Sequence, residues 1–225
     1  MRVQHLFEEK TCTFTCMLSD ELSKETIIVD AVDTKLDRDL AIIRSDELIV
    51  KWIIETHAHA DHKTSAAQLA ELTGWKLTAS SACDTGTATW QLVDKSNPNF
   101  GTYCITAAST PEHTSRSMCF ISEENVFTGD SLLINGCGIT DFQSGSSEDL
   151  YESISSVLFE LPDETTVLTR HGYNNKLSST IGLEKQNNPR FCGKSKSEFV
   201  QLMPDLEIAR HKRIHESIPA NMHSG

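Results

Sequence analysis

Thr56-His57-Ala58-His59-Ala60-Asp61-His62 is the stretch that decides the fold, and it follows directly on an apolar run at residues 51–55 that is typical of a buried strand. Ligand-binding side chains gather at the ends of such strands. In extended backbone His57 and His59 point the same way, and the turn that leads to the helix beyond Lys63 can bring Asp61 and His62 back to the same point. We therefore expect these four side chains to converge at one point.

The residue types of this stretch indicate a transition metal. Imidazole nitrogens together with a carboxylate suit zinc or iron, whereas magnesium and calcium prefer shells made only of oxygen. A polar surface loop is the alternative interpretation. By composition alone, however, the pattern H-x-H-x-D-H arises in a chain of this length only on the order of one time in a thousand. The sequence thus predicts a metal-binding loop.

Three further donors stand just beyond later β-rich segments of the chain, and these are His113, Asp130 and His171. Taken singly, each residue is more often a hydrogen-bonded surface or core residue than a ligand. Because all three follow predicted strands, as the histidine-rich loop does, we expect them to join that loop in one metal site.

Hydrophobic periodicity predicts a mixed α/β domain. Strands are expected at residues 11–18, 26–29, 49–55, 75–79, 103–107, 117–122, 125–127 and 165–169, and the first two should form a hairpin. Helices are expected from a Thr34 N-cap through Leu48, at 66–72, near 148–161 and at 197–203. With no repeat and no linker, this order predicts a single domain over residues 1–225, in which two sheets are covered by helices.

Composition limits the classes of function. Twenty Lys and Arg against 32 Asp and Glu leave a formal net charge of −12, which argues against nucleic-acid binding. No window approaches the ~18 consecutive apolar residues of a membrane span. The first residues lack an apolar signal region, so we expect a cytoplasmic protein. Seven cysteines without close pairing favour reduced thiols over a disulfide framework.

The ligand pattern resembles that of the metallo-β-lactamase fold over nearly the whole chain. This resemblance implies an αββα sandwich with the site at one edge of the two sheets. Binuclear hydrolases of this fold, such as glyoxalase II, bind two metals. The resemblance gives His57, His59 and His113 to one metal and Asp61, His62 and His171 to the other, with Asp130 bridging.

A narrower resemblance is to the persulfide dioxygenases, the ETHE1-like sulfur dioxygenases. It rests on Phe127-Thr-Gly-Asp-Ser-Leu-Leu-Ile-Asn-Gly-Cys-Gly-Ile-Thr-Asp-Phe-Gln143 and on shorter segments at 150–151, 161–162, 184–190, 198–200 and 218–221. It implies one Fe(II) per chain, held by His57, His113 and Asp130. The other donors, His59, Asp61, His62 and His171, would then form a hydrogen-bonded layer around that iron.

Two histidines and one carboxylate leave three coordination positions open, enough for a thiolate-type substrate and O₂ on the same iron. The resemblance implies that glutathione persulfide is oxidised to sulfite and glutathione. It also implies a catalytic, glutathione-contacting Tyr173, with Thr114 and position 139 lining the substrate pocket. The sequence is also compatible with a homodimer.

Three positions differ from the family's pattern. Ile139 stands where the family carries a substrate-contacting Arg, Glu112 replaces a Gly, and Gly172 replaces an Asp. Two alternatives therefore remain: a dinuclear zinc thioester hydrolase of glyoxalase II type, and a non-catalytic thiol- or metal-binding protein of the same fold. Cys137, between two glycines, is interpreted as a buried, inert thiol.

Overall fold

The computed structural model describes residues 1–59, 62–75, 78–80, 90–112, 114, 117–140, 145–172, 176–206, 217 and 221. Its first sheet comes from the N-terminal part of the chain and has four strands in sequence order: β1 (Arg2–Glu8), β2 (Thr13–Ser19), β3 (Glu25–Val29) and β4 (Ile49–Ile54). The pairs β1–β2 and β2–β3 are antiparallel, so the predicted hairpin is confirmed, and β4 joins β3 in parallel.

The second sheet has five strands in the order β15-β14-β11-β10-β9. Their bounds are β9 (Thr106–Ser109), β10 (Met118–Ile121), β11 (Asn125–Phe127), β14 (Thr166–Leu168) and β15 (Ser179–Thr180). The pair β11–β14 is parallel and the other neighbours are antiparallel. Three two-stranded ribbons accompany the sheets: β5 (Thr78–Ser80) with β6 (Trp90–Leu92), β7 (Asn99–Phe100) with β8 (Tyr103–Cys104), and β12 (Leu132–Leu133) with β13 (Gly136–Cys137).

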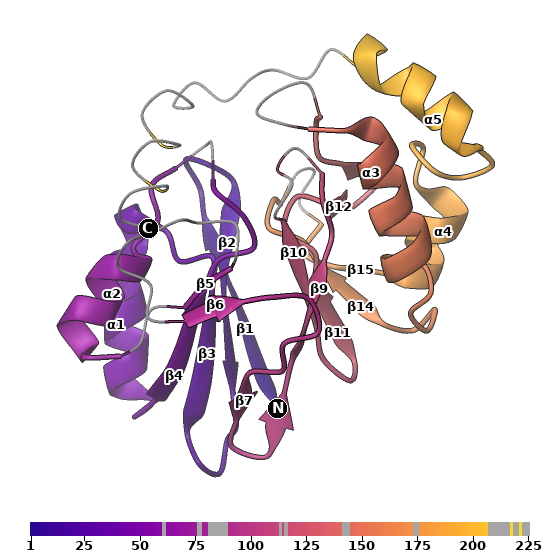
Figure 1. The fold of residues 1–225 in the computed structure, drawn as a ribbon. Coiled ribbons are helices and arrows are strands. Elements are labelled where there is room, and N and C mark those ends of the chain that lie inside the picture. Colours follow the sequence, from indigo (N-terminus) through magenta and orange to yellow (C-terminus); the bar gives the residue numbers. More distant parts are fainter. Residues whose placement is uncertain are drawn as a thin grey trace.

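Helices cover the outer face of each sheet, so the predicted αββα sandwich is confirmed (Figure 1). The first sheet is covered by α1 (Leu36–Ser45) and α2 (Ala66–Thr73). The second is covered by α3 (Ser147–Ser153), which continues as a π-helical turn at Ile154–Leu158, and by α4 (Ile181–Asn187) and α5 (Lys196–Leu202). Within the described residues, no helix combines the length and apolar character that crossing a bilayer requires.

The period of two along each strand divides the apolar side chains between three buried layers. In β3, Ile27 and Val29 face the second sheet, while Ile28 packs under α1 and α2. In β10, Phe120 faces the first sheet, while Cys119 packs under the helices of the other layer. Both faces of both sheets are therefore buried, which holds the sheets at a fixed separation.

The elements missed by the sequence patterns are short or weakly apolar. Strand β1 and helix α4 were not expected, and Thr34 is not the N-cap of α1, because a 3₁₀ turn at Asp33–Lys35 precedes that helix and its N-cap is Lys35. Leu48 lies beyond the end of α1 but is still buried against it. The hydrophobic stripe thus predicted burial correctly and the helix end incorrectly.

Strand ends bring the predicted donors to one edge of the sandwich. The histidine-rich loop follows β4, Asp130 follows β11, and Arg170 and His171 follow β14. The backbone of Arg170 joins the layers, since its N–H donates to Gly129 O (3.2 Å) and its carbonyl accepts from Phe14 N (2.8 Å). Gly129 has φ +54°, and a Cβ there would stand 2.8 Å from Thr56 Oγ1, so this close approach requires glycine.

Replacing Phe120 with Ala should destabilise the sandwich by about 3–5 kcal/mol, because it leaves a cavity between the two sheets. Phe120 is fully buried in the inter-sheet layer. Urea denaturation followed by circular dichroism measures the effect. Leu22→Ala is the matched control, since Leu22 is 92% exposed and its truncation should stay within about 0.5 kcal/mol. Equal stabilities of the two variants would contradict the assignment of this layer as the core.

Candidate metal centre

The histidine-rich loop is held by hydrogen bonds from one residue that lies far along the chain. Asn221 donates from Nδ2 to His59 O (2.9 Å) and His62 O (2.8 Å), and its Oδ1 accepts from Thr64 N (3.0 Å). Its side chain is buried, with 2% exposure. The loop therefore keeps its shape through a contact that spans most of the sequence.

A hydrogen-bond chain fixes the tautomer of His57. Asp30, at the end of β3, accepts from Thr56 N (2.7 Å) and from the Thr56 hydroxyl (2.9 Å). Because that hydroxyl donates its proton to Asp30, its oxygen accepts from His57 Nδ1 at 3.0 Å. The lone pair of His57 is then on Nε2, which is the tautomer that binds a metal through Nε2.

His171 is oriented in the same sense by a different partner. Its Nδ1 lies 3.3 Å from the carbonyl oxygen of Cys12, and a carbonyl only accepts, so Nδ1 donates. In neutral imidazole this leaves the lone pair on Nε2. That atom lies 3.4 Å from Asp130 Oδ1.

Asp130 is the point at which the histidines meet. Its Oδ2 lies 3.5 Å from His57 Nε2, and His57 Nε2 in turn lies 3.3 Å from His59 Nδ1. Burial opposes ionisation of Asp130, but His171, when it is protonated, and Arg170 hold its pKa well below its ordinary value. The carboxylate of Asp130 is therefore ionised, although it is buried beside the imidazole nitrogens of His57 and His171.

The side chain of Arg170 lies among these histidines and Asp130, and the sequence patterns did not predict this role. Its Nη1 is 3.2 Å from His57 Nε2 and 3.1 Å from Asp130 Oδ2, and its Nη2 is 2.9 Å from His62 Nδ1. The residue is 3% exposed. Since guanidinium only donates, both imidazole nitrogens that face it are acceptors.

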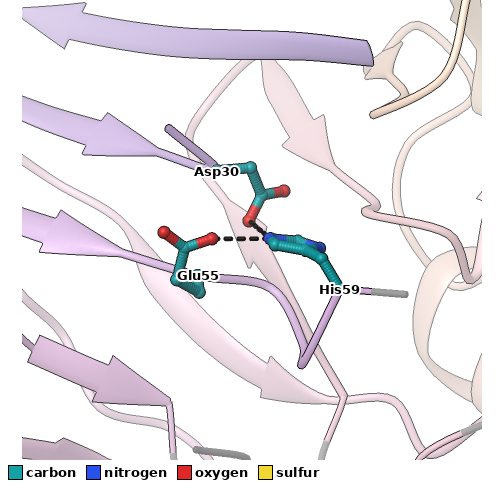
Figure 2. A group of neighbouring side chains, drawn as sticks. All are labelled: Asp30, Glu55 and His59. Carbon is teal, nitrogen blue, oxygen red and sulfur yellow. Dashed lines mark hydrogen bonds and ion pairs between the residues drawn. The ribbon is translucent and has the colours of Figure 1, made fainter. Parts of the chain in front are cut away.

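His59 is held by two carboxyl groups behind the site (Figure 2). Its Nε2 lies 2.6 Å from Glu55 Oε2 and 3.2 Å from Asp30 Oδ1. Burial and the nearby Asp30 charge raise the pKa of Glu55 well above its ordinary value, and burial and Arg170 lower the pKa of His59. The neutral forms of Glu55 and His59 are therefore favoured beside Asp30, whose own pKa lies below its ordinary value.

The ligand atoms of Asp30, Glu55 and His59 all lie within 4.8 Å of one another, so by residue type these side chains could also hold a cation. Their contacts with His59 are direct hydrogen bonds, however, and Asp30 also accepts two bonds from Thr56. We interpret the cluster as a network that orients His59 and His57.

The predicted site residues divide into three groups. The structure brings His57, His59, His62, Asp130 and His171 together, as predicted. Asp61, His113 and Tyr173 lie outside the described residues, so their assignments stay predictions. Thr114 is half-buried, and its hydroxyl is hydrogen-bonded to that of Ser117 (2.6 Å). Ile139 is half-buried beyond the β12–β13 ribbon.

The departures from the family's pattern are consistent with the packing. A Cβ at position 172 would stand 2.7 Å from the ring of Phe14, so Gly172 suits its surroundings. Glu112 is buried, with Oε2 2.8 Å from the place of a Cβ at Gly138. Burial raises the pKa of Cys137 to about 12, which supports its interpretation as an inert thiol.

The donor set fits a metal ion. Two ligands at about 2.1 Å from the same ion stand about 3 to 3.5 Å apart, and the separations around His57 Nε2 and Asp130 are 3.3–3.5 Å. Two imidazoles have Nδ1 engaged elsewhere and Nε2 lone pairs aimed at one carboxylate. His57, Asp130 and His171, with His59 beside them, are thus the described residues that can hold the metal.

Replacing Asp30 with Asn should lower metal affinity by about 10- to 100-fold. An amide NH₂ facing Thr56 makes that hydroxyl donate to His57 Nδ1, which moves the imidazole proton to Nε2 and blocks the ligand lone pair. Competition with a chromophoric chelator measures the affinity, and circular dichroism checks folding. Asp37→Asn, at an exposed position of α1, is the control. A folded Asp30→Asn variant with wild-type metal affinity would contradict the role of the Asp30–Thr56–His57 hydrogen-bond chain.

Comparisons with known proteins agree on the family, although no family model matches the chain. The chain is 34% identical to the persulfide dioxygenase ETHE1 of Bos taurus and 33% identical to that of Homo sapiens, in each case over 99% of this chain and 88% of the relative. The crystal structure of ETHE1 from Myxococcus xanthus superposes with a TM-score of 0.95 at 36% identity, covering 99% and 98% of the two chains.

A metallo-β-lactamase structure from Staphylococcus aureus matches the same fold, with a TM-score of 0.89 at 19% identity, over 100% of this chain and 72% of its own. The predicted resemblance is confirmed at both levels. The family and the fold imply a metal cofactor, and the geometry around Asp130 is suited to hold one. The chain belongs to the ETHE1 persulfide dioxygenase family, within the metallo-β-lactamase fold.

Proposed function

We propose that this enzyme is a mononuclear Fe(II) dioxygenase that converts glutathione persulfide, O₂ and water to glutathione and sulfite. The observation that carries the proposal is the convergence of imidazole lone pairs on the ionised carboxylate of Asp130, in a chain of this family. We propose His57, Asp130 and His113 as the three ligands. A two-histidine, one-carboxylate face is the set used by non-haem Fe(II) oxygenases.

The bound iron would supply adjacent open positions at which the persulfide sulfur and O₂ react. The protein's own residues prepare that reaction. Thr56 and Asp30 keep the proton of His57 on Nδ1. The buried Arg170 guanidinium places a fixed positive charge beside Asp130, which favours an anionic persulfide over a neutral thiol at the same place.

The proposed activity is tested by anaerobic Fe(II) reconstitution, followed by O₂ uptake on addition of glutathione persulfide. We expect O₂ consumption and sulfite in equal amounts, and no cleavage of a glutathione thioester. His113→Ala should abolish both iron retention and O₂ uptake. Thioester hydrolysis by a zinc-loaded chain without O₂ uptake would favour the hydrolase alternative, and an iron-loaded but inactive chain would favour the non-catalytic one.

Substrate affinity tests the role of position 139. Ile139 cannot form the forked hydrogen bonds that Arg makes to a carboxylate. Ile139→Arg should therefore lower KM for glutathione persulfide by about two- to tenfold, with kcat little changed. Ile139→Leu is the matched apolar control and should leave KM unchanged. An unaltered KM in a folded Ile139→Arg enzyme would show that this position does not contact glutathione.

A further inference from the structure

We propose that the side chain of Arg170 occupies, as a built-in cation, one of the two positions that this donor set offers to metal ions, and so limits the site to one metal. The inference deepens the proposed function, since it explains how the same site is kept mononuclear. It rests on the presence of a metal site but not on the identity of the substrate.

The guanidinium contacts two of the side chains that a second metal would need. Its Nη2 lies 2.9 Å from His62 Nδ1, and its Nη1 lies 3.1 Å from Asp130 Oδ2. His62 and Asp130 are fully or almost fully buried, with exposures of 0% and 8%. A metal bound between His62 and Asp130 would have to displace these contacts.

Charge reinforces the steric argument. A guanidinium stays protonated in a protein, so Arg170 carries a fixed positive charge. Arg170 is 3% exposed and has Asp130 as its counter-ion. A divalent ion on the His62 side of Asp130 would therefore stand within a few ångströms of a fixed positive charge at low dielectric, which disfavours its binding.

The backbone keeps the guanidinium in place. Arg170 N donates to Gly129 O at 3.2 Å in one layer, and Arg170 O accepts from Phe14 N at 2.8 Å in the other. The next residue, His171, is paired with Thr13 across a β-bridge. Since both sheets hold this backbone, the side chain has little freedom to withdraw from the site.

The asymmetry of the contacts leaves a place for a single ion. His59 Nδ1 lies 3.3 Å from His57 Nε2. The guanidinium lies 2.9 Å from His62 Nδ1 and 3.2 Å from His57 Nε2, so its contact with His57 is the longer of the two. A metal on the His57 side would replace that longer contact, and the guanidinium on the His62 side would share Asp130 with it.

Metal stoichiometry tests the inference without reference to activity. The chain of residues 1–225 and its Arg170→Ala, Arg170→Gln and Arg170→Lys variants are equilibrated anaerobically with excess Zn²⁺ or Fe²⁺, desalted, and analysed by mass spectrometry for metal per folded chain. We expect about one Zn²⁺ in the wild-type chain and in Arg170→Lys, and about two in Arg170→Ala. Arg170→Gln, which keeps size but not charge, should follow Arg170→Ala.

Arg44→Ala on the exposed side of α1 is the matched control and should bind as the wild type does. Wild-type stoichiometry in both folded neutral variants would overturn the inference, as would two zinc ions in the wild type. A wild-type chain that binds no metal while Arg170→Ala binds one would also overturn it, because the guanidinium would then block the only site. Failure of the proposed oxygenation alone, with the expected metal counts, would leave this inference standing.

Discussion

Hydrogen-bond acceptors that cannot act as donors set the arrangement of this site. The carbonyl of Cys12 and the carboxylate of Asp30 only accept, so they determine which nitrogen of His171 and, through Thr56, of His57 carries the proton. Both lone pairs are consequently aimed at Asp130. Without these partners both tautomers would be populated, and the tautomer protonated on Nε2 could not bind a metal through that nitrogen.

The carboxylate of Asp130 links this arrangement to the scaffold. It stands after β11, where Gly129 brings the backbone against Thr56 of the other sheet. Its negative charge is stabilised by Arg170, whose backbone bridges both layers. The three buried layers keep the sheets at a fixed separation, so the distance between the ends of β4, β11 and β14 is a property of core packing.

Sequence reasoning predicted the architecture and most of the donors because these depend on local patterns. The β-branched run before Asp30 and the apolar runs of β4 and β10 each report burial directly. The strand-end positions of Asp130 and His171 were correct for the same reason. The sequence patterns singled out neither Arg170 nor Asp30 as a site residue, because nothing in a local pattern says which distant group a polar side chain will meet.

The sequence by itself determined the residue types available to the site and the strand ends that carry them, because ligand chemistry and hydrophobic period both depend on short segments of the chain. Only the tertiary structure decided which nitrogens of His57 and His171 carry the proton and that Asp130 is ionised. It also decided that Asn221 hydrogen-bonds the histidine-rich loop and that Arg170 lies beside Asp130. The reason is physical: each depends on contacts between residues about 25 to 160 positions apart, made in a buried site where desolvation makes every unpaired charge costly.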